Sequence, residues 1–485
     1  MDRNKIVNAE TKRGSKYKNL LQNTFVLGIG VFASKFLVFL MMPLYTGILS
    51  PGEYSTADLI SQTANLIIPL ACVGISDGIF RFAMDSDRDR RTVFSSGFFV
   101  LLVSSVIFGL LSPLIGLVEY FNSYSLLIAA YVISANIHSV CAQYLRACNR
   151  TKLFALQGII NTVLVIVFNV LLLVVFDMRV EGYVLSVILA DLVTSIVLLF
   201  ACGLFKDLKP RFVDFGLVKG LLKYSIPMIP ATIFWWITSV SDRYMVTYFS
   251  GDEINGLYTA AYKIPTLLSL VSTVFMEAWQ YSAVSENEND KENAKTFFGE
   301  VFEHYQAIMF VAASAMVALS QIFIMLLCAD SYFDAWKYVP VLTLSAVFSG
   351  FTAFLGSIYL VKKKSSLTFL TSMAGALVNI VLNFLMIPWI GAQGAAVATL
   401  ASYILVFGIR AANTRRYVPF SLHLGRMTVN LAIVSLQTIL ILCMPKYLWI
   451  TQPLCIIAVV AVNFRVLWQA ISRLLGALLR KTKKQ

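Results

Sequence analysis

Apolar stretches of about 20 residues or more recur along almost the whole chain, from Asn23 to Leu475. As a helix, a stretch of that length crosses the hydrocarbon core of a bilayer, which is about 30 Å thick. A water-soluble domain hides its apolar side chains in one core, but this chain of 485 residues is 58% hydrophobic and only 13% charged. The sequence therefore predicts an all-α membrane protein with about fourteen transmembrane helices.

Polar segments between the apolar runs divide the chain into six predicted parts. These are an N-terminal tail (1–22), an N-lobe of six helices (23–205), a linker (206–223), a C-lobe of helices 7 to 12 (224–412), helices 13 and 14 (413–475), and a basic tail (476–485). The opening segment is polar and basic and lacks the apolar core and cleavage site of a secretory signal, so we expect the first helix to be retained.

Positive charges gather on one side of the predicted membrane. Of the 39 Lys and Arg residues, 32 fall in alternate polar segments, four lie within spans, and the opposite side has three, namely Arg179, Lys337 and Lys446. Loops in the cytoplasm retain Lys and Arg, so this alternation predicts an even number of helices with both termini cytoplasmic. The net charge of +13 is thus a topology signal and does not indicate a nucleic-acid partner, which would need a solvated basic surface.

Cysteines and histidines give no sign of a metal or cofactor. The seven cysteines occur singly and mostly within apolar runs, without a C-x-x-C pair. The three histidines, His138, His304 and His423, lack the spacing that places two ligands on one helix face. We expect the cysteines to act as small hydrophobic residues and predict neither a protein-ligated metal nor a cofactor.

Two segments of the chain resemble each other. One begins with NRTKLFALQG at Asn149 and the other with KKKSSLTFLT at Lys362. Each has a basic turn, a helix carrying Asn, a short turn, and a return helix that begins at Gly182 or Gly394. Because the two units lie an even number of helices apart, they predict two parallel six-helix lobes, an architecture typical of alternating-access transporters. A duplicated scaffold without transport is the alternative.

Charged residues inside the predicted spans need a reason, since each costs about 2.5 to 3.5 kcal/mol at mid-bilayer on insertion scales. We interpret four basic residues as candidate substrate-binding residues: Lys35, Arg81, Arg243 and Lys263. Four acidic residues are candidates for gating or ion coupling: Asp58, Asp191, Asp242 and Glu277. Asp242 and Arg243 are neighbours in sequence, do not share a helix face, and therefore need separate partners.

Less specific interpretations compete with these roles. Arg81 suits an ordinary cytoplasmic-side charge, and Arg243 could extend along the helix to the outer interface. The carboxylates could be proton carriers or satisfied structural groups. Nearby aromatic residues such as Tyr54, Tyr258 and Tyr262 could stack on sugars, although such residues more often fill helix contacts. Two prolines, Pro227 and Pro230, predict a kink before the segment that carries Arg243.

Several motifs resemble those of a known family. The segments GISDGIFRFAM and FMEAWQYSA, with S-x-x-D-R-Y at Ser239 and G-x-Y-x-x-A-x-K-I at Gly256, are similar to the O-antigen and capsule repeat-unit polysaccharide flippases. These belong to the multidrug/oligosaccharidyl-lipid/polysaccharide exporter superfamily. The resemblance covers essentially the whole chain. Ser55 departs from the pattern, because the family usually has Gly at this position. The positions that match the family pattern are Lys35, Arg81, Asp242, Arg243 and Lys263.

The resemblance implies a non-enzymatic flippase of a bacterial cytoplasmic (inner) membrane, with two lobes around a cationic cavity. Its implied partners are the lipid bilayer and a polyprenyl-pyrophosphate-linked glycan, with a glycan polymerase and glycosyltransferases as further candidates. A lipid II flippase is an alternative, as is a multidrug cation antiporter of the same superfamily, which would favour a carboxylate-rich cavity. A membrane glycosyltransferase or polymerase is disfavoured, because no sizeable outward loop is predicted for catalysis.

Overall fold

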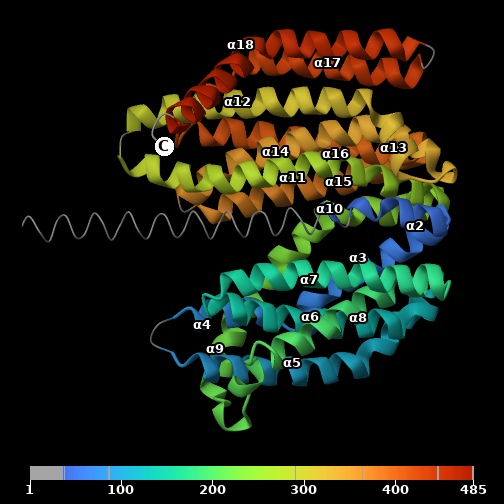
Figure 1. The fold of residues 1–485 in the computed structure, drawn as a ribbon, viewed down its shortest axis with the longest axis vertical. Coiled ribbons are helices and arrows are strands. Elements are labelled where there is room, and N and C mark those ends of the chain that lie inside the picture. Colours follow the sequence, from blue (N-terminus) through green and yellow to red (C-terminus); the bar gives the residue numbers. More distant parts are fainter. Residues whose placement is uncertain are drawn as a thin grey trace, which may run out of the picture. The chain divides into compact units, whose positions relative to one another are not determined.

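A computed structural model of the chain describes residues 36–37, 39–85, 88–289, 291–362, 364–444 and 447–482. All regular elements among these residues are helical (Figure 1), which confirms the predicted all-α class. The residues cluster into two compact units. Unit 1 contains the described residues before Ser50 together with Thr56–Trp236, and unit 2 contains Ser50–Ser55 and the described residues from Ile237 onward. The predicted lobe boundaries at 205 and 224 stay a prediction.

Unit 1 is a bundle of α-helices joined by short 3-10 and π turns. Its α-helices are α2 (Met42–Ile48), α3 (Pro51–Ala71, without its first turn), α4 (Ile75–Ala83), α5 (Arg90–Leu111), α6 (Ser125–Ala147), α7 (Thr151–Asn169), α8 (Arg179–Phe200), α9 (Phe215–Ser225) and the start of α10 (Ile229–Ser250). The π turn η3 (Val170–Val175) follows α7, and the 3-10 turns are η1 (Ser112–Leu117), η2 (Glu119–Tyr124), η4 (Leu204–Asp207), η5 (Pro210–Phe212) and η6 (Ile226–Met228). Asp89 and Asp214 cap α5 and α9 by accepting hydrogen bonds from first-turn N–H groups.

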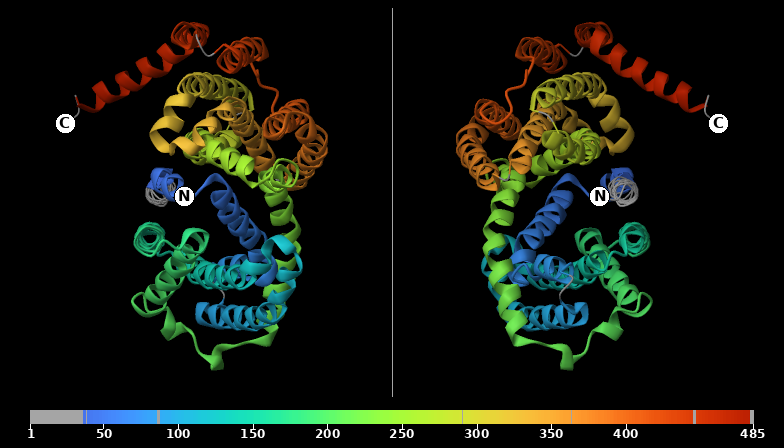
Figure 2. Two further views of the ribbon diagram at one scale, coloured as in Figure 1. Left: turned by 90° about the vertical axis from the view of Figure 1, so that its right-hand side faces the viewer. Right: turned by 90° about the vertical axis from the view of Figure 1, so that its left-hand side faces the viewer.

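Unit 2 contains the rest of α10 and the longer helices of the chain. They are α11 (Asp252–Asn289), α12 (Lys291–Ala318), α13 (Ser320–Leu327), the 3-10 turn η7 (Asp330–Lys337), α14 (Val339–Val361), α15 (Ser365–Ile390), α16 (Ala392–Thr414), α17 (Leu424–Cys443) and α18 (Leu448–Thr482). The helices within this unit run side by side, and many are seen nearly end-on in Figure 2. Helix α14 is the most buried of its apolar spans, with 89% of its apolar window inside the structure.

The number of spans is close to the predicted one. Among the described residues, 11 helices are long and apolar enough to cross a membrane, and α3 with α4, bent by 55°, would make a twelfth. The predicted first span, 23–46, lies mostly outside the described residues, and α10 is a further helix of 22 residues. A multi-pass membrane protein is thus confirmed, and fourteen is an approximate count.

Two local features depart from or refine the sequence interpretation. The charged segment SENENDKENAKT interrupts the apolar pattern, but α11 continues to Asn289 and α12 begins at Lys291. Glu, Lys and Ala are good helix formers, so hydropathy marks the end of the apolar part and not the end of the helix. The 3-10 turn η6 holds Pro227 and separates α9 from α10, so the α-helix is interrupted where the prolines predict a kink.

The repeated segments form the helix pairs α7/α8 and α15/α16, one in each unit. The return helices begin at Arg179 and Ala392, slightly before the predicted glycines, and Gly182 and Gly394 lie in their first turns, close to the chain that precedes them. A Cβ on Gly182 would lie 2.9 Å from the Met178 Cβ, and a Cβ on Gly394 would lie 2.6 Å from the Met386 carbonyl group. The glycines that mark the repeat in sequence therefore allow close approach of the two chain segments in both units.

Candidate functional site

The family motifs of α10 and α11 place a charged and aromatic cluster inside unit 2. Asp242 and Arg243 are 4% and 6% exposed. The Tyr258 hydroxyl donates a hydrogen bond to Asp242 Oδ2 at 2.7 Å, and the Asp242 Oδ1 atom accepts the backbone N–H of Arg243 at 3.0 Å. The Arg243 guanidinium lies over the Tyr262 ring, 5.2 Å from its centre. The two neighbours thus have separate side-chain partners, as predicted.

Lys263 follows Tyr262 on α11 and is half-buried. Its carbonyl oxygen accepts a hydrogen bond from the Thr266 hydroxyl. Two cations therefore lie in one short region of unit 2. Arg243 is buried against the face of the Tyr262 ring, and the half-buried Lys263 follows Tyr262 in sequence. A guanidinium on a ring keeps its charge and its N–H donors, so this region can attract an anionic group.

Close packing explains why the second motif begins with glycine. A Cβ on Gly256 would lie 1.9 Å from the Pro51 carbonyl oxygen, so only glycine allows the first turn of α3 to pack here. Ser55 is fully buried in the same contact, where its hydroxyl donates to Asp252 Oδ1 at 3.3 Å and accepts from Asn255 Nδ2 at 2.8 Å. The serine that departs from the family pattern thus adds a polar link within unit 2.

The tyrosines of this region mainly fill helix contacts. Tyr54 and Tyr258 are almost fully buried. Tyr54 packs edge-on against Tyr332, with ring centres 6.2 Å apart, and Tyr258 packs likewise against Tyr338 at 5.9 Å. These contacts support the packing interpretation of the two aromatic residues over a sugar-stacking role.

Unit 1 holds a second polar cluster, which contains two of the predicted acidic residues. Asp191 on α8 is 5% exposed and pairs with His138 on α6, with Nδ1 and Oδ1 separated by 2.9 Å. Asn161 Nδ2 on α7 donates to the same carboxylate oxygen at 3.1 Å. Asp58 on α3 is 3% exposed, and Gln62 Nε2 lies 3.4 Å from its Oδ1. The three candidate carboxylates whose side chains the structure describes, Asp58, Asp191 and Asp242, are thus engaged by side-chain donors.

His138 is the residue that sequence reasoning missed. The histidines were assessed only for metal-ligand spacing, and by that test His138 was dismissed. A titratable side chain in the middle of an apolar span is itself a functional signal, and that signal would have found it. No group of three or more His, Cys, Asp or Glu side chains among the described residues could hold a metal ion.

The remaining predicted site residues lie elsewhere. Arg81 is exposed in the last turn of α4. Lys35 and the side chain of Glu277 lie outside the described residues. The structure thus places Asp242 and Arg243 together in unit 2, with Lys263 one residue after Tyr262, and it places Asp58 and Asp191 in unit 1.

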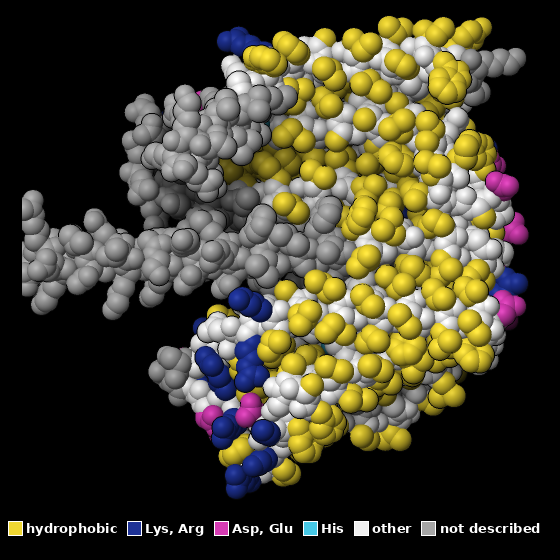
Figure 3. Space-filling view, in the orientation of Figure 1, with side chains coloured by type: hydrophobic (Ala, Val, Ile, Leu, Met, Phe, Trp, Pro, Cys, Tyr) yellow, Lys and Arg dark blue, Asp and Glu magenta, His cyan; other side chains and the backbone are white. Residues whose placement is uncertain are grey.

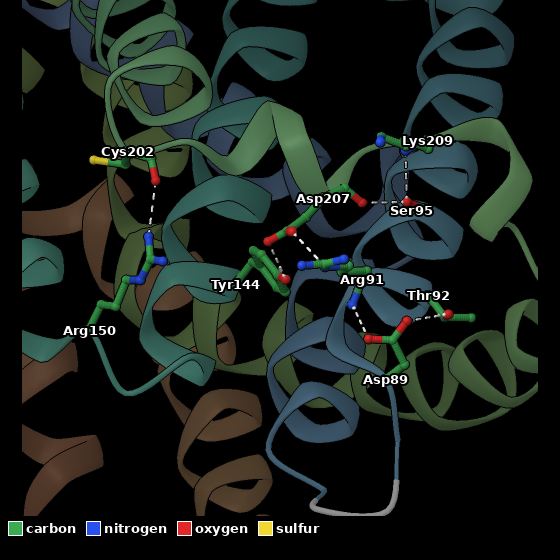
Figure 4. Close-up of polar contacts among 9 residues, drawn as sticks. All are labelled: Asp89, Arg91, Thr92, Ser95, Tyr144, Arg150, Cys202, Asp207 and Lys209. Carbon is green, nitrogen blue, oxygen red and sulfur yellow. Dashed lines mark hydrogen bonds and ion pairs between the residues drawn. The ribbon is translucent and has the colours of Figure 1, made fainter.

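Basic side chains gather at one end of unit 1, here called the linker end (Figure 3). The turns η4 and η5 of the segment 201–214 pack against α5, and η4 also packs against α8. Asp207 organises this end, as Figure 4 shows: its carboxylate accepts from the Tyr144 hydroxyl at 3.0 Å and pairs with Arg91 at 3.1 Å. Arg150 donates to the Cys202 carbonyl at 3.0 Å. Burial raises the pKa of the nearby Cys148 thiol, so this cysteine is a weak nucleophile at neutral pH.

Comparison with known proteins identifies the class. The model of the family described as polysaccharide biosynthesis protein matches residues 20–280, more than half of the chain. The chain therefore belongs to this family, which confirms the resemblance to polysaccharide flippases of the exporter superfamily.

Solved structures show the same fold at low sequence identity. The chain is similar to the lipid II flippase MurJ in an inward closed conformation, with 14% identity, a TM-score of 0.69, and coverage of 92% of this chain and 99% of that one. It is also similar to an inward-facing multidrug resistance MATE family transporter of the MOP superfamily, with 16% identity, a TM-score of 0.59, and coverage of 81% and 94%. No curated protein matches this chain.

Proposed function

We propose that this chain is a flippase that moves a polyprenyl-pyrophosphate-linked oligosaccharide from the cytoplasmic to the outer leaflet of a bacterial cytoplasmic membrane. The observation that carries this proposal is the buried guanidinium of Arg243 over Tyr262, with Lys263 next in sequence. A guanidinium is always charged in proteins and forms charge-assisted, often paired hydrogen bonds with phosphate oxygens.

The substrate chemistry agrees with these cations. A pyrophosphate cannot cross hydrocarbon without compensation of its charge, whereas the polyprenyl tail can stay in the lipid throughout. We expect Lys35 and Arg81 to add further contacts to the headgroup, and Asp242 to hold the cationic helix in place through Tyr258. Alternating access then requires two states that differ by on the order of a few kcal/mol.

The basic linker end of unit 1 supports an orientation. Cytoplasmic loops retain Lys and Arg, so the linker end and both termini face the cytoplasm in this proposal. The substrate is then received from glycosyltransferases on that side and passed to a glycan polymerase on the other. The chain itself forms and breaks no covalent bond.

A lipid II flippase is the second candidate, because the fold similarity to MurJ extends over 99% of that chain. Lipid II also carries a pyrophosphate, so the two candidates share the same headgroup chemistry. A cation antiporter is disfavoured by the buried Arg243, whose charge would repel a cationic drug.

Complementation separates these candidates. Strains that lack a repeat-unit flippase are transformed with the wild-type chain or with Arg243→Gln, Arg243→Lys or Lys35→Ala, and surface glycan is measured against membrane protein level. Arg465→Gln, at an exposed site on α18, is the matched control.

We expect the wild type and Arg465→Gln to restore glycan, Arg243→Gln and Lys35→Ala to abolish it, and Arg243→Lys to restore only part, because an ammonium cannot donate two parallel hydrogen bonds. Full export by Arg243→Gln would remove this residue from the mechanism. Rescue of a MurJ-depleted strain alone would favour the second candidate.

A further inference from the structure

A histidine and an aspartate face each other in the interior of unit 1, away from the cations considered above. Their side chains are 16% and 7% exposed, and His138 Nδ1 lies 2.9 Å from Asp191 Oδ1. On the other side of the ring, His138 Nε2 lies 2.7 Å from Gln157 Oε1 on α7. Three helices, α6, α7 and α8, therefore contribute one side chain each to a continuous hydrogen-bonded chain.

The partners of the imidazole suit both of its protonation states. When both ring nitrogens carry protons, Nδ1 donates to the carboxylate and Nε2 donates to the carbonyl oxygen of Gln157. When Nε2 loses its proton it becomes an acceptor, and a half-turn of the Gln157 amide presents an N–H₂ donor in place of the oxygen. Both ring nitrogens thus keep a hydrogen-bond partner in either protonation state.

The carboxylate is held in position by neutral groups. Asn161 Nδ2 donates to Asp191 Oδ1 at 3.1 Å, and the Thr194 hydroxyl donates to Asn161 Oδ1 at 3.1 Å, which fixes the orientation of this amide. Because Asn161 has its oxygen occupied by Thr194, it can only act as a donor toward Asp191. The negative charge therefore stays directed at the imidazole.

The other titratable groups around the pair are few among the described residues. Tyr131 on α6 lies within electrostatic range of Asp191, of Tyr183 on α8, and of Asp58 on α3. The side chains that α7 contributes here, Gln157 and Asn161, are uncharged. Histidine is the side chain whose ordinary pKa lies near neutral pH, which favours the imidazole of this cluster as a proton carrier.

We propose that His138 and Asp191 form a proton-binding site whose loading and unloading drive the transport cycle, an inference that rests on the proposed flippase function. A proton suits this pair, because the imidazole Nδ1 already lies within hydrogen-bond distance of the carboxylate. Protonation changes the net charge of this buried cluster by one. Such a change can shift the equilibrium between two conformations of a helix bundle.

The histidine content of the chain makes a direct test possible. Because the chain has three histidines, protein labelled only at histidine gives three ring signals in NMR spectra. His304→Gln and His423→Gln assign the other two. His423 pairs with Glu303 at 3.6 Å and His304 contacts the Glu300 carbonyl, so both serve as internal controls in unit 2.

In a titration between about pH 5 and pH 8, we expect the His138 signal to show one proton-binding event. In Asp191→Asn its midpoint should move by about one pH unit or more, while the two control signals stay in place. A His138 signal that does not titrate, or a midpoint that ignores the Asp191→Asn change, would overturn the proposal. A midpoint that differs between sodium and choline chloride would instead assign the site to sodium.

Coupling to transport is measured separately in the complementation strain. His138→Gln and Asp191→Asn should reduce surface glycan to the level of the empty vector at normal membrane protein level, whereas His304→Gln should export like the wild type. Normal export by both site variants would disprove the coupling. Failure of the wild-type chain to export any glycan would count against the flippase function alone, because the NMR titration does not depend on it.

Discussion

The helix pairs α7/α8 and α15/α16 have the same sequence layout and similar glycine contacts, but different polar contents. Aligning Gly182 with Gly394 places Asp191 opposite Tyr403. Unit 1 thus has a titratable His–Asp pair where unit 2 has a phenol and a neutral ladder, in which Asn383 donates to Asn379 Oδ1 at 3.0 Å and Asn379 to Thr399 at 3.2 Å. A duplicated scaffold can therefore keep its packing while its two described copies carry different polar groups.

The helix pair α15/α16 of unit 2 also contains a buried, permanently charged side chain. Arg410 on α16 is 5% exposed and donates to the Thr371 hydroxyl at 3.0 Å, to the Thr352 carbonyl at 2.7 Å and to the Ser372 hydroxyl at 2.9 Å. Its guanidinium ties α14, α15 and α16 together through neutral acceptors. Because a guanidinium does not lose its proton in proteins, this link is permanent, in contrast to the His138 contact.

The largest expected effect is the loss of this link. Arg410→Met should lower the free energy of unfolding by about 3 kcal/mol or more, because it removes hydrogen bonds from a charged donor and leaves their acceptors buried. Denaturant unfolding of the purified protein in detergent measures it. Arg465→Met, at an exposed position, is the control and should change little. Equal stability of the two variants would show that Arg410 does not hold the helices of unit 2 together.

Alanine substitutions of the repeat glycines should lower the free energy of unfolding by different amounts. Gly394→Ala should cost about 2 to 3 kcal/mol of unfolding free energy, because the new Cβ meets backbone atoms of Met386. Gly182→Ala should cost less, since its nearest contact, the Met178 Cβ, is 2.9 Å away and not 2.6 Å. Gly158→Ala on α7 has open space around it and should be neutral or slightly stabilising. The same unfolding assay ranks the three, and a reversed order would contradict the similar packing of the two pairs.

A smaller effect should distinguish the neutral ladder from the titratable pair. Asn379→Leu should cost about 1 kcal/mol, the usual value of a hydrogen bond between membrane helices. Since no group of the ladder titrates, the loss should be the same at about pH 6 and about pH 8. Thermal unfolding at both values tests this. A pH-dependent loss would mean that the ladder is linked to an ionisable group.

The smallest effect is expected at the turn between the helices of each pair. In unit 2 a glycine, Gly391, has a φ of 60°, whereas in unit 1 Asp177 has a φ of 47° and pairs with the exposed Arg179. Asp177→Gly removes the strain of a left-handed aspartate and also a surface ion pair, so stability should change by less than about 1 kcal/mol. Calorimetry of the variant checks this, and a large loss would give the ion pair an importance that its exposure does not suggest.

Much of the fold follows from the sequence, because a chain in lipid must satisfy its backbone internally and can do so only as helices here. Apolar length therefore predicted the spans, and the glycine-led repeat predicted the matching helix pairs. Hydropathy did not predict the ends of α11 and α12, whose charged extensions are helical by propensity.

The candidate site was predictable in part. Asp242 and Arg243 were singled out because charges in apolar spans are costly, and the need for separate partners follows from helix geometry. Which partners they have was not predictable, because Tyr258 and Tyr262 reach them from the next helix. The partner of His138 was not predictable either, because Asp191 lies far along the chain on another helix.

By itself, the sequence determined that most of this protein lies in lipid, which family it belongs to, and which charged residues lie within apolar spans. These features depend on local composition and spacing. The tertiary structure alone decided which polar groups meet: the imidazole with the carboxylate in unit 1, and the guanidinium with the aromatic ring in unit 2. Hydropathy acts on each helix separately, whereas hydrogen bonds and ion pairs act over a few ångströms between helices, so only packing can select them.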